Sequence, residues 1–307
     1  MIHERRLLAR GLGAARHYRK MATRPLIRML ASSRIARKPL NGLHNAMSFE
    51  ARAQFHEAYA KIFYPQLSGQ NGFWLSHFNG HMLKLPLATP SFARDWDLAV
   101  SITAHDWEVK RTYELLLQDR AIDLFVDIGA NFGTHSLLFL VSGVPAVSFE
   151  PNADCCAHFA ELAALNGLDA DIRNVALGAA PGWATLRFPE GKSWLGSIMR
   201  ENDTHAMLKQ KVEVRTLDSY RLQGRMLIKI DAEGAELDIL RGGMETIGSQ
   251  RPLIIFESLD LDERHDYQAF FVERGYVIQG LPLGQQSDFL YSPQTNFIAV
   301  PRERFAT

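Results

Sequence analysis

Short apolar runs alternate with longer amphipathic segments in the second half of the chain. Five runs are continuous enough to be strands buried on both faces: residues 124–128, 146–149, 171–175, 226–230 and 252–256. The connecting segments have helical length and spacing, near residues 134–141, 153–166, 234–243 and 262–274. Apolar strands joined by helical crossovers predict an α/β fold, in which helices cover both faces of a parallel sheet.

Two elements are predicted before this pattern begins. Asn79-Gly80 lies between two strand-like runs and predicts a β-hairpin. His77 and His81 flank the turn, and a place on the hairpin surface is favoured over metal ligation because no third ligand of a suitable type is near. Residues 106–120 have the spacing of a helix with one apolar face.

A further departure from the alternation lies at residues 178–215, between the third and fourth strands. Two strand-like runs predict a small hairpin there, and the loop between them contains Trp194. That ring could cover a bound substrate, and it could equally belong to a small satellite core.

Charge is distributed unevenly, although the whole sequence is neutral. Of the 34 Lys and Arg residues, eleven lie in residues 1–40, together with a single acid, Glu4. The arm at residues 1–44 is therefore basic, and its leucines have roughly helical spacing. It could lie on an anionic membrane surface, but a partly disordered arm, or a helix packed on the acidic remainder, is favoured. An organelle-import segment is a further alternative.

Cysteine content and apolar run length bear on the compartment. Cys155 and Cys156 are adjacent in a helix-like stretch, a spacing that suits neither a disulfide framework nor a metal site. No apolar stretch in the sequence is long enough to span a bilayer. We therefore expect a cytoplasmic protein, with peripheral contact at a membrane surface as the alternative.

Residues that could bind a ligand begin where the first strand ends. Asp127 lies at the end of that strand, and Gly129 and Gly133 follow before the helix. Glycines allow a tight turn and a close approach of a ligand, and the free amides of the helix start point to the same place. Glu150 ends the second strand, where an acid can accept hydrogen bonds from both hydroxyls of a ribose. An adenosine-type ligand is indicated; the alternative is a plain turn with Asn131 as the helix cap.

The same loop distinguishes between two adenosine ligands. A dinucleotide-binding loop would have glycine in place of Asn131 and Thr134, so the cradle for a diphosphate is incomplete. The Asp127 carboxylate would also repel a diphosphate. S-adenosyl-L-methionine has no phosphate and carries a sulfonium and an ammonium group, so the acidic loop favours it over NAD.

This half of the chain resembles the FkbM-type S-adenosylmethionine-dependent methyltransferases. The resemblance depends on motifs in family order and at family spacing: "FVDIGANFGTHS", "VSFEPNADCCAHFAELAALNGL", "IRNVALG", "VEVRTLDSY", "LIKIDAEGAELDILRGG" and "PLIIFES". Together they cover roughly residues 105–300. The set is specific, above all "KIDAEGAE" beside "DIGAN".

The resemblance implies a class I methyltransferase fold: a Rossmann-like, mostly parallel seven-stranded sheet with helices on both faces and a reversed last strand at residues 295–301. The domain would span residues 121–307, after an accessory region of hairpin and helix at residues 45–120. Members of the family mostly methylate hydroxyl oxygens on sugars, lipids or secondary metabolites. We expect a small-molecule or glycan acceptor and no nucleic acid, because the catalytic region is acidic.

The resemblance also implies contacts with the cofactor at the ends of the first three strands. The residues concerned are Asp127, Gly129, Asn131 and Gly133 for the methionine part, Glu150 for the ribose, and Asn174 and Ala176 near the adenine.

Catalysis is expected at the end of the fourth strand, where an acceptor hydroxyl needs a base. Asp231 is the first choice for that base and Glu233 the second. His135, just inside the first helix, is another candidate base, although its position suits a capping or cofactor-side contact better. Glu236 is expected to stabilise the start of the following helix, and Glu233 could equally have that role. Lys229 could neutralise one of these carboxylates.

Other interpretations remain open. Asp231, Glu233 and Glu257 could together hold Mg²⁺, an alternative that is not favoured because Glu257 could equally be a buried acid paired with a basic neighbour. An NAD-type oxidoreductase on a related sheet and an adenosine-binding protein without catalysis are the other classes. The sequence does not decide the oligomeric state.

Overall fold

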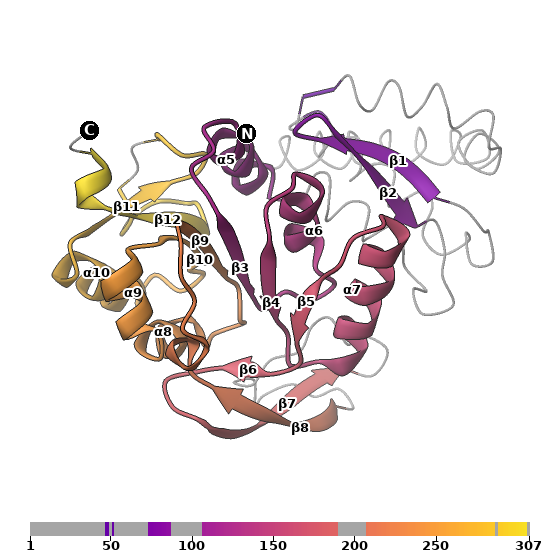
Figure 1. The fold of residues 1–307 in the computed structure, drawn as a ribbon. Coiled ribbons are helices and arrows are strands. Elements are labelled where there is room, and N and C mark those ends of the chain that lie inside the picture. Colours follow the sequence, from indigo (N-terminus) through magenta and orange to yellow (C-terminus); the bar gives the residue numbers. More distant parts are fainter. Residues whose placement is uncertain are drawn as a thin grey trace, which may run out of the picture. The chain divides into compact units, whose positions relative to one another are not determined.

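The computed structural model describes residues 47–48, 51, 73–86, 106–189, 207–285 and 288–305. The chain divides into two compact units, Met1–His77 with Lys84–His105, and Phe78–Leu83 with Asp106–Thr307. The larger sheets and their helices belong to the second unit (Figure 1). The basic arm at residues 1–44 and the loop with Trp194 lie outside the described residues, so the predictions about them stay predictions.

The predicted hairpin is confirmed. Strands β1 (Phe73–Phe78) and β2 (His81–Pro86) form a two-stranded sheet around Asn79-Gly80. Both turn residues have positive φ, 47° at Asn79 and 80° at Gly80, as a two-residue turn between twisted strands requires. Asparagine and glycine adopt this conformation at low cost, so the turn follows directly from the sequence.

A seven-stranded sheet forms the centre of the second unit, in the order β11-β12-β10-β9-β3-β4-β5. Its strands are β3 (Leu124–Ile128), β4 (Ala146–Phe149), β5 (Asp171–Arg173), β9 (Met226–Ile230), β10 (Leu253–Glu257), β11 (Tyr276–Gly280) and β12 (Asn296–Pro301). Strands β5, β4, β3, β9 and β10 pair in parallel, whereas β12 is antiparallel to β10 and β11. The mostly parallel sheet and its reversed last strand are confirmed. The apolar pattern does not predict β11.

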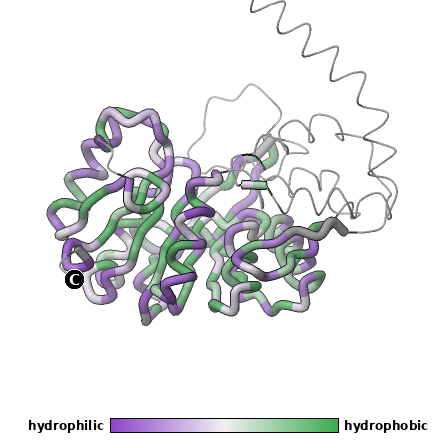
Figure 2. Tube along the Cα trace, turned by 90° about the horizontal axis from the view of Figure 1, so that it is seen from above, coloured by the Kyte–Doolittle hydropathy of each residue, from purple (hydrophilic) through white to green (hydrophobic). Residues whose placement is uncertain are grey.

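Helices cover both faces of this sheet. They are α5 (Trp107–Gln118), α6 (Thr134–Val141), α7 (Ala153–Leu165), α8 (Glu236–Arg241), α9 (Met244–Gln250) and α10 (Arg264–Glu273), with short 3₁₀ helices η2 (Leu217–Tyr220) and η3 (Arg302–Phe305). On one face, the ring centroids of Tyr113 in α5 and Phe139 in α6 lie 5.6 and 4.0 Å from that of Phe125 in β3. Hydrophobic segments run through the interior in Figure 2, because both faces of the sheet are covered.

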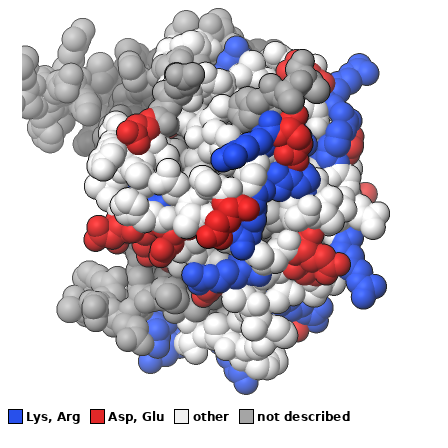
Figure 3. All heavy atoms as spheres, turned by 90° about the vertical axis from the view of Figure 1, so that its left-hand side faces the viewer, with Lys and Arg blue, Asp and Glu red and all other residues white. Residues whose placement is uncertain are grey.

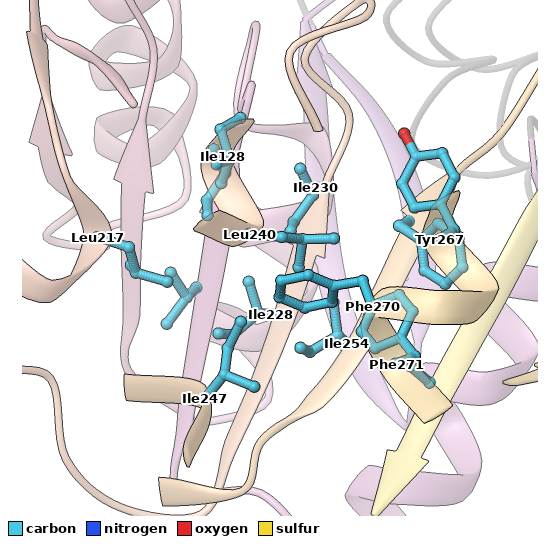
Figure 4. Packing of buried hydrophobic residues seen from close by; sticks show 14 of the residues in the cluster. Ile128, Leu217, Ile228, Ile230, Leu240, Ile247, Ile254, Tyr267, Phe270 and Phe271 are labelled. Carbon is cyan, nitrogen blue, oxygen red and sulfur yellow. The ribbon is translucent and has the colours of Figure 1, made fainter. Parts of the chain in front are cut away.

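The core on the other face lies between the sheet and the last three helices. Ile228 and Ile230 of β9 and Ile254 of β10 pack with Leu240 of α8 and Ile247 of α9 (Figure 4). All five side chains are essentially inaccessible to water. Dense packing of this kind resists displacement, so the strand ends give a rigid base to the loops that follow them.

A separate three-stranded sheet follows β5 in the chain. It comprises β6 (Ala176–Leu177), β7 (Gly182–Pro189) and β8 (Met207–Arg215). β7 and β8 are antiparallel, which confirms the hairpin predicted within residues 178–215. The third strand of the main sheet was expected to reach residue 175, and this boundary is wrong. The amide of Val175 donates to the carbonyl of Arg173 at 2.9 Å, a three-residue turn that ends β5 and directs the chain into the other sheet.

The face formed by α8, α9, α10 and β11 carries charges of both signs. Basic and acidic side chains lie side by side over it (Figure 3). Arg241 of α8, for example, pairs with Asp238 at 2.8 Å, and both side chains are more than half exposed, so the pair stabilises the fold only weakly. Within the described part of the chain, no helix is long and apolar enough to cross a membrane.

Candidate active site

Four loops meet at the carboxyl edge of the central strands. β3, β4, β9 and β10 are parallel, and their carboxyl ends are in register: Ile128 lies opposite Phe149 and Ile230, and Ile230 lies opposite Phe256. Most of the predicted site residues follow one of these strands or end it. The edge therefore brings together Asp127, Gly129, Asn131, Gly133, Glu150, Asp231, Glu233 and Glu257.

The glycines of the first loop make room for other parts of the chain. Gly129 has a φ of 77°, and a Cβ there would overlap the backbone oxygen of Asp231. Gly133 has a φ of 68°, and a Cβ there would overlap the ring of Phe159. Backbone conformation and internal contacts, rather than clearance for a ligand, are the physical reason for glycine at both positions. Contact of this loop with a cofactor stays a prediction.

Asp127 is completely buried and holds the start of α6. Its Oδ2 accepts hydrogen bonds from the amide and the hydroxyl of Ser136, at 3.2 and 2.6 Å. Burial raises the pKa of Asp127, and Lys229 and Ser136 oppose this rise by favouring the carboxylate. Its Oδ1 has no hydrogen-bond partner within the described residues. The residue thus supports the loop from beneath and keeps one acceptor atom unused.

Glu150 connects the loops that follow β3 and β4. Its Oε2 accepts a hydrogen bond from the amide of Asn131, and its Oε1 from the amide of Asn152, both at 2.8 Å. Each carboxylate oxygen has a second lone pair, which a ribose hydroxyl could use. Burial raises the pKa of Glu150 to about 7, against the effect of the two amide bonds. The backbone therefore fixes the acid that is predicted to bind the ribose.

Asn174 and Ala176 lie in different surroundings. The Asn174 amide donates to the carbonyls of Glu150 and Pro151, each at 2.9 Å, so it joins the end of β5 to the loop after β4. Ala176 packs in the core of the three-stranded sheet. The expectation that Ala176 closes the third strand of the main sheet is therefore wrong, because the turn after Arg173 takes the chain out of that sheet.

A buried lysine lies between the first loop and the acids after β9. Lys229 is opposite Asp127 in the sheet, and its Nζ forms an ion pair with Oδ2 of Asp231 at 2.8 Å. Burial alone would lower the pKa of Lys229, but Asp231 and Asp127 outweigh it and raise the pKa above its ordinary value. Lys229 therefore stays charged and neutralises Asp231, as the alternation along β9 predicts.

The acids after β9 differ in their exposure and in their hydrogen-bond partners. The Asp231 side chain is 38% exposed, and Lys229 holds one of its oxygens. Glu233 is partly exposed and has a φ of 53°, in the left-handed region. Glu236 is buried, and its carboxylate accepts hydrogen bonds from two amides of the preceding loop. These bonds give Glu236 the structural role at the start of α8 that is expected of it.

Glu257 ends β10 beside Asp231. Within the described residues, no group donates a hydrogen bond to its carboxylate or forms an ion pair with it. Burial raises the pKa of Glu257 to about 7, and the charge of Asp231 adds to the rise. The expected alternative, a pair with a basic neighbour, is not found there, since Lys229 bonds to Asp231 instead.

Helix α5 contributes buried side chains that the sequence motifs do not include. The hydroxyl of Tyr113 lies 3.0 Å from Nδ1 of His135, and both residues are buried. This contact places His135 in a supporting position rather than in that of an exposed base. Lys110 is fully buried one turn earlier, and burial lowers its pKa to about 8 against the charge of Asp106. A lysine beside the apolar face of the predicted helix is the signal that could have identified it.

Metal binding has no support from this geometry. In the part of the chain that the structure describes, no group of three or more His, Cys, Asp or Glu side chains could hold a metal ion. Mg²⁺ at Asp231, Glu233 and Glu257 is therefore not supported. His77 and His81 are both exposed on the hairpin, where the sequence places them.

The side chains at this edge fit S-adenosylmethionine better than a dinucleotide. Asp127, Glu150 and Asp231 are acids, and the unused Oδ1 of Asp127 and the second lone pairs of Glu150 are acceptors only. Carboxylates attract a sulfonium and an ammonium group and repel a diphosphate. Each carboxylate oxygen of Glu150 keeps one lone pair beside its amide bond, and contact with the ribose hydroxyls stays a prediction.

Comparison with known proteins agrees with this chemistry. Residues 127–278 match the methyltransferase FkbM domain. None of the curated proteins compared with the sequence matches it.

Several solved structures are similar in fold. They include a methyltransferase FkbM from Methylobacillus flagellatus KT, with 16% identity and a TM-score of 0.40 over 69% of this chain and 55% of that one. Two others are a ribosomal protein L11 methylase from Lactobacillus delbrueckii subsp. bulgaricus (13%, TM-score 0.38, 65% and 80%) and a precorrin-6y C5,15-methyltransferase from Geobacter metallireducens GS-15 (14%, TM-score 0.34, 64% and 88%). The chain spans about half the length of the first of these. Similarity at this level carries no argument about activity.

The domain match includes both sides of the edge described above. It begins at Asp127 and extends past Glu150, Lys229 and Glu257. A domain of this kind implies S-adenosylmethionine as the methyl donor. The chain carries a methyltransferase FkbM domain at residues 127–278, just under half of its length.

Proposed function

We propose that this chain transfers a methyl group from S-adenosylmethionine to a hydroxyl oxygen of a sugar, a lipid or another small metabolite. The observation that carries the proposal is the presence of partly exposed carboxylates, Asp231 and Glu257, beside the predicted cofactor loop. An alcohol must lose its proton as the new bond forms, and a carboxylate within reach can accept that proton. Acids at this edge therefore suit an oxygen acceptor.

The residues of the first two loops would bind and orient the cofactor. Glu150 would accept hydrogen bonds from the ribose, and the loop from Gly129 to Gly133 would hold the methionine part. When bound, S-adenosylmethionine supplies an electrophilic methyl group on a sulfonium. The contact of Gly129 with the backbone of Asp231 would keep the cofactor loop in a constant position relative to the acids. Much of the rate enhancement of a displacement reaction comes from such alignment.

Calorimetry tests the cofactor assignment. S-adenosylhomocysteine, the product form of the cofactor, should bind to the full chain, and NAD should not, because three acids border the loop where a diphosphate would lie. Tight binding of NAD with no binding of S-adenosylhomocysteine would contradict the proposal and favour an oxidoreductase.

Transfer is tested with S-adenosylmethionine carrying a ¹³C-labelled methyl group. The protein is incubated with water-soluble and lipid fractions of a cell extract, and the chemical shift of the new methyl group identifies the atom that bears it. We expect label on oxygen, and Glu273→Gln, an exposed change on α10, should leave its incorporation unchanged. Label found only on nitrogen, sulfur or carbon would overturn the oxygen assignment.

A further inference from the structure

We propose that Glu257, rather than Asp231, accepts the proton of the acceptor hydroxyl. This inference rests on the proposed function and assigns the base within it. The position of Asp231 at the end of the fourth strand makes it the first choice from the sequence, but the contacts of the folded chain favour the acid on the neighbouring strand.

The register of the sheet places the two acids side by side. Ile230 of β9 lies opposite Phe256 of β10, so Asp231 and Glu257 follow at the same level. Lys229 lies opposite Ile255. Because side chains alternate along a strand, Asp231 and Glu257 both project to the face that Lys229 occupies. An acceptor hydroxyl beside one carboxylate is therefore near the other.

The two carboxylates differ in their freedom to accept a proton. Oδ2 of Asp231 bonds to the ammonium group of Lys229 at 2.8 Å, in a pair whose lysine is almost fully buried. A carboxylate oxygen that already accepts a charge-assisted hydrogen bond from an ammonium group is less available to an incoming hydroxyl. The carboxylate of Glu257 has no hydrogen bond or ion pair within the described residues, so its lone pairs are available to an incoming hydroxyl.

The charges around Glu257 suit the role of a base. Those that act on it are Asp231 and Glu233 from the loop after β9, Lys229 from β9 and Asp106 before α5. Burial, then Asp231, raises the pKa of Glu257 to about 7, while Lys229 opposes the rise. A base is most effective when its pKa lies near the working pH.

The step balances without a further reactant. The hydroxyl proton moves to a carboxylate oxygen of Glu257, and the electron pair that held it forms the new bond to the methyl carbon. The electron pair of the broken carbon–sulfur bond stays on sulfur, which becomes a neutral sulfide. Glu257 then returns its proton to water.

The test compares three variants, Glu257→Gln, Asp231→Asn and the exposed control Glu273→Gln. S-adenosylhomocysteine binding is measured by calorimetry, and transfer by incorporation of ¹³C-methyl into the extract fractions, at several pH values. Glu257→Gln should bind S-adenosylhomocysteine with an affinity within about twofold of the wild type. It should transfer methyl ~10² to 10⁴ times more slowly, the usual contribution of a general base, and without the wild-type rise in rate near pH 7.

Asp231→Asn should give a different result. Loss of the negative charge beside Glu257, together with release of Lys229, should lower the pKa of Glu257 and move the rise in rate to lower pH. The same shift should appear without catalysis, in the titration of the Glu257 carboxyl followed by ¹³C NMR of glutamate-labelled protein. A purely structural role for Glu257 would not produce this displacement.

The outcomes separate the two proposals. If the wild type transfers methyl to oxygen and Glu257→Gln does so at the same rate and with the same pH profile, Glu257 is not the base and only the inference fails. If Asp231→Asn abolishes transfer while Glu257→Gln keeps it, Asp231 is the base. If the wild type binds S-adenosylhomocysteine but labels no oxygen, the proposed function fails, and the inference fails with it.

Discussion

Glu150 and Glu257 occupy equivalent places on two strands of the sheet but have different surroundings. Each lies at the carboxyl end of a parallel strand, and burial raises the pKa of each to about 7. Two backbone amides hold the carboxylate of Glu150 at 2.8 Å, whereas no group within the described residues bonds to that of Glu257. Glu150 and Glu257 therefore share a raised pKa, but only the Glu150 side chain is fixed by hydrogen bonds.

The difference indicates that the two sides of the carboxyl edge have different roles. On the side of β3 and β4, hydrogen bonds to the backbone fix the residues in advance, which suits a ligand of constant shape such as a cofactor. On the side of β9 and β10, the acids remain partly exposed, which suits an acceptor that arrives afterwards and gives up a proton. Lys229 and Gly129 connect the two sides, the first by charge and the second by backbone contact.

Lys229→Met should have the largest effect, because it removes the cation shared by both sides. The fully buried Asp127 would lose the charge that favours its ionised form. Loss of the cation that compensates a buried carboxylate typically costs about 3 to 5 kcal/mol, and we expect a loss in that range from urea unfolding at pH 8. Lys209→Met, an exposed change on β8, should alter stability by less than about 0.5 kcal/mol.

The pH dependence of this loss has a defined sign. Without Lys229, the already raised pKa of Asp127 rises further, so ionisation of Asp127 costs more in the folded state than in the unfolded one. That cost is present at high pH and disappears as the pH falls and the group takes up a proton. The deficit relative to the wild type should therefore shrink from pH 8 to pH 5. A deficit that grows on acidification would show that Asp127 is not the group affected.

Gly129→Ala should have the next largest effect, because it separates the two loops where they touch. A Cβ at this position would overlap the backbone oxygen of Asp231, which cannot move aside as a flexible side chain could. We expect a loss of about 3 kcal/mol in urea unfolding, from overpacking added to the cost of a positive φ. Gly143→Ala is the matched control: its φ is 80°, but a Cβ there would meet nothing within 4 Å. Equal losses would mean that conformation alone requires glycine at 129.

Much of the fold could be predicted because burial imposes a simple pattern. The strands at 124–128, 146–149 and 226–230 agree with β3, β4 and β9 to the residue, since strands covered on both faces are mostly apolar. Strand β11 does not show this pattern: it lies at the edge of the sheet beside β12, and Val277, its second residue, is exposed. An edge strand with mixed burial has no clear period, so the sequence alone does not identify it.

The contacts of the candidate site could likewise be predicted only in part. The ion pair of Lys229 with Asp231 could be predicted, because two residues that alternate along one strand share a face. The reason for Gly129 could not be predicted, since the backbone oxygen that it approaches belongs to Asp231, in the loop after β9, far away in the sequence. The sequence also does not show that the Glu257 carboxylate is left without an ion pair. This follows from the bond of Lys229 to Asp231, which only the folded chain reveals.

Glu150→Gln should reduce the affinity for S-adenosylhomocysteine without unfolding the protein. A neutral amide accepts weaker hydrogen bonds from ribose hydroxyls than a carboxylate does. At pH 8 we expect about a tenfold weaker affinity by calorimetry, equivalent to about 1.4 kcal/mol. Glu257→Gln should leave this affinity nearly unchanged, which separates the two glutamates directly. Similar losses in both variants would contradict the division of the edge into a cofactor side and an acceptor side.

The last effect, of similar size, is the pH dependence of that affinity in the wild type. In the free protein, burial raises the pKa of Glu150 from 4.5 to about 7. Ribose hydroxyls donate to the ionised form and so lower the pKa in the complex, which means that affinity is full above pH 7 and falls as the pH falls. Between pH 8 and pH 6 the ionised fraction of a group with a pKa of 7 decreases about tenfold, and the affinity should follow it.

The two glutamates can be separated by this slope because they share a pKa but not a ligand. Glu150→Gln should bind S-adenosylhomocysteine with an affinity that no longer varies between pH 8 and pH 6. Glu257→Gln should keep the full slope, since Glu257 lies at the end of a different strand and would not contact the ribose. A slope that survives in Glu150→Gln and vanishes in Glu257→Gln would exchange the two roles, because the titrating group that senses the cofactor would then be the one on β10.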